Sequence, residues 1–164
     1  MLEPGTITLL NGSDGESAAL AAHLAEQGRK VLFLNLRGSA PYWGENGSKP
    51  HGLRAFRGGP LDLTHYRPAR EVVKVLEQVK PDVVVVDSLD QTHAFPKGEK
   101  RLWRMWEVFD SVRDIMAYAS NAVAFVFAYS RPVPSSWLKP YPRALEGAPP
   151  LVNAVLNTVG LLAA

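Results

Sequence analysis

The sequence contains no cysteine. Disulfide bonds, thiolate catalysis and cysteine-ligated zinc or iron–sulfur centres are therefore excluded. No apolar run approaches the roughly 18 residues of a membrane-spanning helix, and the start of the chain lacks the basic and apolar regions that direct secretion. The formal net charge is only +2, so a basic surface for nucleic acid has to be local. These absences predict a cytoplasmic protein without a membrane segment.

What the chain does contain is a regular alternation of strand and helix patterns. The strongest strand signal is the valine run within 82–87, and continuous valine is typical of a strand covered on both faces of a parallel sheet. Other strands are expected at 6–10, 30–35 and 122–129, with a short one near 53–56, and helices at 17–27, 68–80 and 99–119. The segments 37–60 and 131–150 are expected to be mostly irregular, and 151–162 to supply a short helix and a last strand. The pattern predicts one domain, residues 1–164, of the α/β class: a doubly wound, mostly parallel sheet flanked by helices.

Polar or glycine-containing segments follow four of the expected strands. They are 11–17, 35–39, 87–91 and the residues from Ser130 onward. Ligands of doubly wound sheets bind at the carboxyl ends of the strands. We therefore expect these segments to lie along one edge of the sheet and to form the functional site.

The segment 10–17 stands where a phosphate-binding loop would stand, between a strand and an Ala/Leu-rich helix. The motif for such a loop is G-x-x-x-x-G-K-[ST]. Gly15 and Ser17 match its second glycine and its hydroxyl, but Leu10 replaces the first glycine and Glu16 replaces the lysine. Two like unit charges about 4 Å apart cost roughly 4 kcal/mol at an effective dielectric constant near 20. Glu16 is therefore predicted to repel the phosphates that a lysine would hold.

Five segments resemble, in order, the core of the RecA-like ATPases, especially the recombinase, replicative-helicase and clock-protein branches. Residues 5–10 resemble the opening strand, 29–36 the second strand and 81–89 the Walker B segment. Residues 124–130 resemble the strand that ends in a polar sensor residue, and 153–162 the closing strand. The order of these segments over nearly the whole chain carries the resemblance, which implies a RecA-like P-loop fold.

The resemblance also implies where a nucleotide site would be, and the departures indicate that the site is vestigial. Its residues would be Gly12, Ser13, Gly15, Glu16, Ser17 and Asp87. Ser17 would be a Mg²⁺ ligand and Asp87 the Walker B acid. The family's catalytic glutamate follows the second strand, where this chain has Arg37, and a guanidinium cannot act as a base. Glu45, further along the same segment, is an alternative base. We expect no catalytic residue, no metal site and no cofactor, with ATP and Mg²⁺ as cofactors only if a remodelled loop still binds them.

The carboxylates of the loop have two interpretations. Asp14 and Glu16 can be solvated residues at a helix N-terminus, where a carboxylate gains about 0.3–1 kcal/mol from the helix dipole. Alternatively, they occupy the vacant phosphate site and stabilise the empty loop. Asp87 and Asp90 offer too few ligands for a divalent ion, and the four histidines share no ligand spacing and are expected at the surface or in loops.

Basic and aromatic residues mix in two segments, a combination that suits single-stranded nucleic acid because bases stack on aromatic rings. The first segment contains Lys97, Lys100, Arg101, Trp103, Arg104 and Trp106. The second contains Arg131, Trp137, Lys139, Tyr141 and Arg143. For the first segment we favour two core-facing tryptophans on a helix with a solvated basic face. For the second, nucleic-acid contact, a packed loop and a stiff partner-binding segment all stay open.

Together these observations predict a non-catalytic RecA-like protein that acts by binding, as an accessory or regulatory partner in DNA recombination, repair or replication. A protein partner is expected, and single-stranded DNA is a possible ligand. One alternative is a nucleotide-binding ATPase with a remodelled P-loop, and another is a protein that binds single-stranded DNA without nucleotide. Filament-forming members of the resembled family carry added segments for subunit exchange, and the expected strands and helices of this sequence include no such segment. The resemblance therefore implies no long filament, while a small homo-oligomer stays open.

Overall fold

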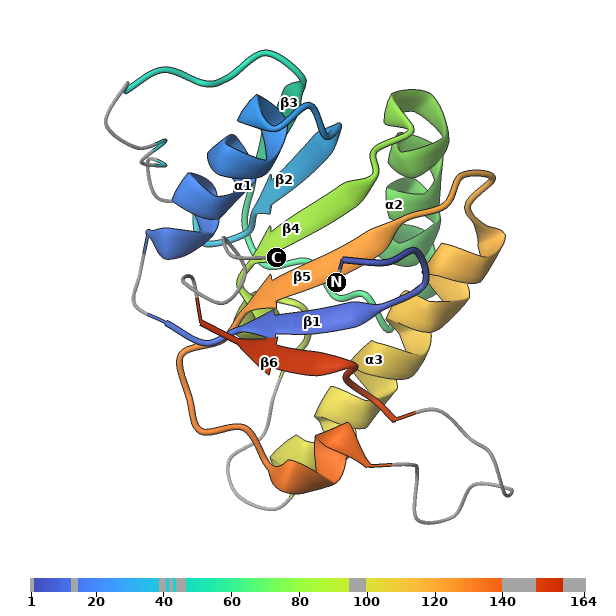
Figure 1. Cartoon of the computed structure of the whole chain (residues 1–164). Coiled ribbons are helices and arrows are strands. Elements are labelled where there is room, and N and C mark those ends of the chain that lie inside the picture. Colours follow the sequence, from blue (N-terminus) through green and yellow to red (C-terminus); the bar gives the residue numbers. More distant parts are fainter. Residues whose placement is uncertain are drawn as a thin grey trace.

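The computed structural model describes residues 2–12, 15–38, 41, 43, 47–94, 100–139 and 150–157. Within them, six strands form one sheet in which every pairing is parallel, in the order β3-β2-β4-β5-β1-β6. The strands are β1 (Ile7–Leu10), β2 (Val31–Asn35), β3 (Leu53–Arg57), β4 (Val83–Asp87), β5 (Ala124–Ala128) and β6 (Ala154–Leu156). The arrowheads in Figure 1 all point toward one edge of the sheet, its carboxyl edge.

In the described part of the chain, α-helices cover both faces of this sheet (Figure 1). They are α1 (Glu16–Glu26), α2 (Tyr66–Val79) and α3 (Lys100–Tyr118). Helix α1 packs on one face through Leu20 and Leu24, and α2 and α3 pack on the other through residues such as Leu76 and Phe109. The prediction of a doubly wound α/β fold is confirmed.

Successive side chains of a strand point to opposite faces of the sheet. Each central strand therefore contributes to the apolar cluster on both faces. In β4, Val83 and Val85 face α1, whereas Val84 and Val86 face α2 and α3. All five residues of β4 are buried. The valine run therefore belongs to a central strand covered on both faces, as predicted.

Helix α1 ends where the sequence indicates. Gly28 has a φ of 91°, a left-handed conformation that a glycine adopts without strain. Its N–H donates to the carbonyl of Ala25, and the N–H of Arg29 donates to that of Leu24. These two bonds form a Schellman motif, which satisfies the last carbonyls of the helix.

Most expected elements are confirmed with shifted ends. Helix α2 begins at Tyr66, before the expected residue 68, because Pro68 is tolerated within the first helical turn. Residues 151–157 contain β6 but no helix, so the expected short helix is not in that part, and 158–162 lie outside the described residues. Within 131–139 the chain forms one short 3₁₀ helix, Ser135–Leu138. No helix in the described part of the chain combines the length and apolar character needed to cross a membrane.

Candidate functional site at the carboxyl edge of the sheet

Backbone hydrogen bonds join the expected segments at the carboxyl edge. The N–H groups of Leu36 and Arg37 donate to the carbonyl of Asp87 at 2.8 and 3.2 Å, which ties the turn after β2 to the end of β4. The N–H of Asn11 donates to the carbonyl of Leu156 at the end of β6. The predicted convergence of these segments on one edge is therefore confirmed.

At the N-terminus of α1, the side chain of Glu16 folds back toward Gly12. Gly15 caps the helix with a φ of 90°. A Cβ atom placed on Gly12 would overlap with Oε2 of Glu16. Leu10, at the position of the missing first glycine, is a buried core residue on the α1 face. This arrangement agrees with the interpretation in which a carboxylate fills the loop, while Ser13 and Asp14 lie outside the described residues.

Ser17 occupies the first turn of α1 and is buried. Its Oγ has no hydrogen-bond partner among the described residues. A buried hydroxyl without a partner is uncommon, because leaving a buried polar group unpaired costs about 1–3 kcal/mol. Ser17 is the one residue of the predicted nucleotide site whose side chain is left available for a ligand within the described part of that site.

The acid at the end of β4 is paired with the residue at the position of the expected base. Nε of Arg37 lies 2.7 Å from Oδ1 of Asp87, and the two side chains are 25% and 11% exposed. A turn holds Arg37 there, because Oδ1 of Asn35 accepts from the N–H of Gly38 and Nε of Arg57 donates to the carbonyl of Gly38. A carboxylate covered by a guanidinium is a poor ligand for Mg²⁺, since the cation would have to displace a charged partner. Glu45, the alternative base, lies outside the described residues.

Asn11 bridges the ends of β1 and β5. Its side-chain amide donates to the carbonyls of Tyr129 and Arg131, both at 3.0 Å. After β1 the chain continues to the α1 face, whereas after β5 it continues to Trp137, which packs on the opposite face. Ligands of doubly wound folds bind where the connections diverge in this way. In this chain the side-chain amide of Asn11 joins the diverging segments after β1 and β5 through hydrogen bonds within the chain.

Further along the same edge, the carboxylate of Asp90 is paired with one arginine from α3 and one from the segment after β5. Arg101 of α3 donates to its Oδ1, and Nε of Arg131 lies 4.0 Å from the same atom. The side chains of Ser88 and Gln91 hydrogen-bond to each other and cap the short 3₁₀ helix Leu89–Gln91. Among the described residues, no group of three or more histidine, cysteine, aspartate or glutamate side chains could hold a metal ion.

The second basic and aromatic segment is only partly exposed. Trp137 is fully buried, with its ring centroid 5.1 Å from that of Phe109 and 5.7 Å from that of Tyr129. The prediction that Trp137 takes part in a nucleic-acid or partner surface is therefore wrong, because the apolar core on the α3 face has taken up its ring. Arg131 and Lys139 are exposed. Tyr141 and Arg143 lie outside the described residues.

The first basic and aromatic segment also differs from expectation. Trp106 packs against the core as predicted, but Trp103 is 48% exposed and contacts Trp106 edge to face. Arg104 forms an ion pair with Glu107 at 2.9 Å. The core on the α3 side therefore accommodates the ring of Trp106, and the ring of Trp103 covers Trp106 from the solvent side. Lys97 lies outside the described residues, as does the side chain of Lys100.

Sequence reasoning missed one cluster of ionisable groups. Nδ1 of His93 lies 2.9 Å from Oδ1 of Asp62, and Nε2 of His93 lies 3.8 Å from Oε2 of Glu107. Thr64 donates from its hydroxyl and its N–H to the same oxygen of Asp62. Burial opposes ionisation of Asp62, but the hydrogen bonds from Thr64 and His93 outweigh it and lower the pKa of this carboxyl. These residues come from three separate segments, so no spacing in the sequence indicates the cluster.

The fold and this edge define a doubly wound α/β protein whose strand-end loops are held by internal hydrogen bonds and ion pairs. The sequence matches no model of a known protein family and no curated protein.

Proposed function

We propose that this chain is a non-catalytic RecA-like protein that acts by binding, as an accessory or regulatory partner in DNA recombination, repair or replication. The carrying observation is the ion pair of 2.7 Å between Arg37 and Asp87. In the family that the sequence resembles, the two corresponding positions hold the catalytic base and the Walker B acid. In this chain the position of the base holds the cation Arg37, which neutralises the carboxylate of Asp87.

The loop before α1 supports the same proposal. Glu16, at the position of the phosphate-binding lysine, lies against Gly12 within the loop. The loop thus carries an acid where the family has a cation, and the turn after β2 carries a cation where the family has an acid. The two exchanges act together, because the first disfavours phosphate and the second disfavours Mg²⁺ and removes the base.

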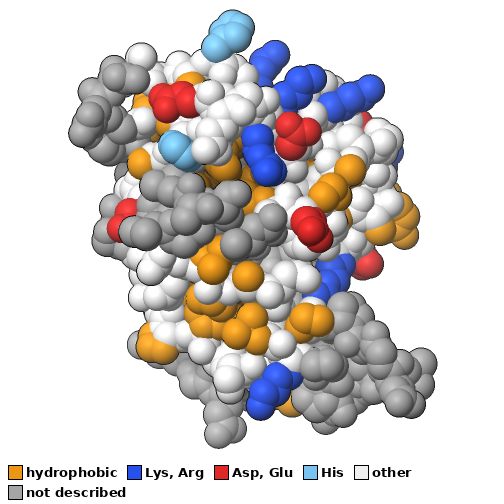
Figure 2. All heavy atoms as spheres, in the orientation of Figure 1, with side chains coloured by type: hydrophobic (Ala, Val, Ile, Leu, Met, Phe, Trp, Pro, Cys, Tyr) orange, Lys and Arg blue, Asp and Glu red, His pale blue; other side chains and the backbone are white. Residues whose placement is uncertain are grey.

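A protein partner fits the exposed surface better than single-stranded DNA does. DNA binding requires basic side chains and accessible rings in one place, but Trp137 is buried and Arg101 and Arg104 are paired with carboxylates. Figure 2 shows Lys and Arg side chains interspersed with Asp and Glu side chains on the face that it displays. Arg131 and Lys139, which follow β5, are both exposed, and Arg131 also lies 4.0 Å from Oδ1 of Asp90.

One observation favours a second candidate, a nucleotide-binding protein with a remodelled loop. Oγ of Ser17 is buried without a partner among the described residues, and it stands where a Mg²⁺ ligand would stand. If this candidate holds, Mg-ATP at 100 times its Kd stabilises the folded chain by about 2.7 kcal/mol. Calorimetry and thermal unfolding with millimolar ATP and ADP, with and without Mg²⁺, separate the two candidates. We expect neither heat of binding nor a change in Tm, and Mg²⁺-dependent binding that Ser17→Ala or Asp87→Asn abolishes would overturn the first proposal.

Binding of a protein partner is tested by reversing the charges of Arg131 and Lys139. We expect a protein captured from extract by the wild-type chain to be lost with the variant Arg131→Glu/Lys139→Glu. A matched control, Arg70→Glu/Lys74→Glu, reverses two charges on α2 and should retain it. Fluorescence anisotropy with a labelled oligo-dT strand tests the DNA alternative, which predicts affinity that falls steeply with salt. Loss of the gene is expected to sensitise cells to DNA-damaging agents, and unchanged sensitivity would contradict the assignment to recombination, repair or replication.

A further inference from the structure

A pocket of about 360 Å³ opens at the amino edge of the sheet, opposite the loops described above. It lies between the C-terminal half of α3 and the segments that lead into β1, β5 and β6. Its lining residues are Gly5, Arg113, Met116, Ala117, Asn121, Ala122, Val123 and Asn153. This volume falls in the lower part of the range of roughly 300–1,000 Å³ that is typical of small-molecule sites.

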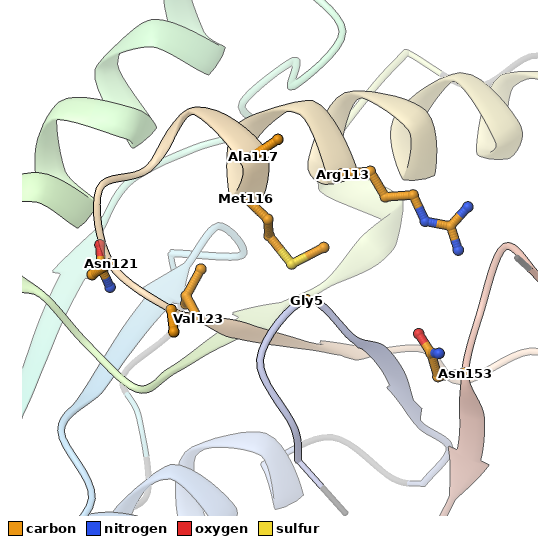
Figure 3. Close-up of a pocket in the computed structure, with 8 residues that line it drawn as sticks. Gly5, Arg113, Met116, Ala117, Asn121, Val123 and Asn153 are labelled. Atoms are coloured by element: carbon orange, nitrogen blue, oxygen red, sulfur yellow. The ribbon is translucent and has the colours of Figure 1, made fainter.

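The pocket has polar side chains on two sides. On one side Arg113 and Asn153 offer hydrogen-bond donors, and on the other Asn121 donates from Nδ2 to the carbonyl of Pro81, while its Oδ1 is buried without a partner among the described residues. Figure 3 shows Arg113 and Asn153 on one side of Gly5, with Met116 and Val123 on the other. Arg113 donates from Nη2 to the carbonyls of Pro150 and Leu151, the latter at 3.1 Å. Within the described part of the chain, its Nε and Nη1 have no hydrogen-bond or ion-pair partner.

Asn153 supplies a second donor. Its Oδ1 accepts from the N–H of Ile7 at 2.9 Å, which fixes the orientation of the amide. No described residue accepts a hydrogen bond from its Nδ2. The pocket thus presents single guanidinium N–H donors from α3 and one amide donor from the segment before β6.

The charge of Arg113 is only partly balanced. Burial lowers the pKa of the guanidinium, and the charge of Asp110, one helical turn earlier, opposes this effect. No carboxylate of the described residues lies within ion-pair distance of Arg113. Both parallel donor pairs of a guanidinium include Nη2, which here already donates to two backbone carbonyls, so Nε or Nη1 offers a carboxylate a single charge-assisted hydrogen bond. The side chains of Met116, Ala117 and Val123 offer an apolar wall beside it.

We propose that this pocket binds a small carboxylate with a short aliphatic body. The carboxylate accepts one hydrogen bond from Nε or Nη1 of Arg113 and one from Nδ2 of Asn153, and the aliphatic body lies against Met116 and Val123. The site is separate from the function proposed above, since it lies at the opposite edge of the sheet and uses none of the same residues.

The test is a titration of the ¹⁵N-labelled chain with hexanoate, followed by NMR, with hexylamine and 1-hexanol as probes of the same length. We expect saturable shifts at the amides of Gly5, Ala117 and Val123 with hexanoate, and much weaker effects with the other two probes. The key variant is Asn153→Asp, which keeps an acceptor for Ile7 but replaces the donor by a carboxylate. It should weaken hexanoate binding roughly tenfold or more, as the loss of a hydrogen bond to a charged group implies.

Arg113→Gln should weaken binding to a similar extent, while Arg104→Gln, which removes an equal charge from the same helix, should leave it unchanged. The NMR spectra of the free variants report on folding, and Asn153→Asp keeps the test valid if Arg113→Gln loosens the contact with residues 150–151. The proposal is overturned if hexanoate gives no saturable shift, if hexylamine or hexanol binds equally well, or if both Asn153→Asp and Arg113→Gln bind hexanoate like the wild type.

Discussion

Replacement of Arg37 by alanine should destabilise the chain because it leaves the Asp87 carboxylate without its cation. Two unit charges about 4 Å apart attract by roughly 4 kcal/mol at an effective dielectric constant near 20. Desolvation of both groups offsets much of this energy in a buried pair, and fully exposed pairs contribute about 0–1 kcal/mol. The side chains here are 25% and 11% exposed, between the two limits. We therefore expect a coupling energy of about 2 kcal/mol, within the range found for contacting residues.

A double-mutant cycle measures this coupling. Arg37→Ala, Asp87→Asn and the double variant are unfolded with urea, and the free energies of unfolding are compared with that of the wild type. Arg54→Ala is a useful control because it removes an exposed cation from the neighbouring strand β3 and leaves the turn after β2 intact. A coupling energy below about 0.5 kcal/mol would refute the inference that Arg37 neutralises Asp87, because that is the value typical of independent sites.

Two further predictions concern the α3 side of the sheet. Trp137→Ala should lower the free energy of unfolding by about 3–5 kcal/mol because it empties a fully buried site. The control Lys139→Ala should change it by less than about 0.5 kcal/mol. Equal effects of the two substitutions in urea unfolding would contradict the packing of Trp137. The lowered pKa of Asp62 contributes stability that is present above the unfolded value of about 3.9 and is lost as the pH falls through the folded value. Asp62→Asn should therefore lose less unfolding free energy than the wild type between about pH 5 and pH 2.5, and parallel curves would exclude this contribution.

The strands and helices could be predicted because their signals are local. The valines of β4 and the alternating core residues of the sheet reflect burial that the sequence period already encodes. Gly28 marks the end of α1 through its own backbone conformation. The meeting of the strand ends at one edge then follows from parallel topology, which is why the convergence of these segments was predictable.

The contacts within the site depend on information that no local pattern carries. The pairing of Arg37 with Asp87 requires both the parallel register of β2 with β4 and the turn formed by Asn35 and Gly38. The burial of Trp137 had no signal either, because a proline-rich segment has no period that separates a core face from a solvent face. Composition therefore suggested a binding surface at Trp137 where the fold required a core residue.

Under the proposed function, the acid at Glu16 and the cation at Arg37 raise the question of whether charge alone prevents this chain from binding a nucleotide. The variant Glu16→Lys/Arg37→Glu restores a cation to the loop and an acid to the turn after β2. We expect it to gain no Mg-ATP binding in calorimetry. Leu10 is anchored in the core at the position of the first glycine, and Asn11 ties the end of β1 to the backbone after β5.

Both constraints act on the path of the backbone, which a reversal of side-chain charge does not alter. The double variant also removes the cation from Asp87, so a lack of binding cannot be attributed to a blocked acid. The comparison variant Glu16→Gln/Arg37→Gln removes both charges without restoring the family pattern and should also fail to bind. If Glu16→Lys/Arg37→Glu binds Mg-ATP and Asp87→Asn in that background abolishes the binding, then the loop has kept a shape that accepts phosphate. Charge alone would then have separated this chain from a nucleotide-binding protein.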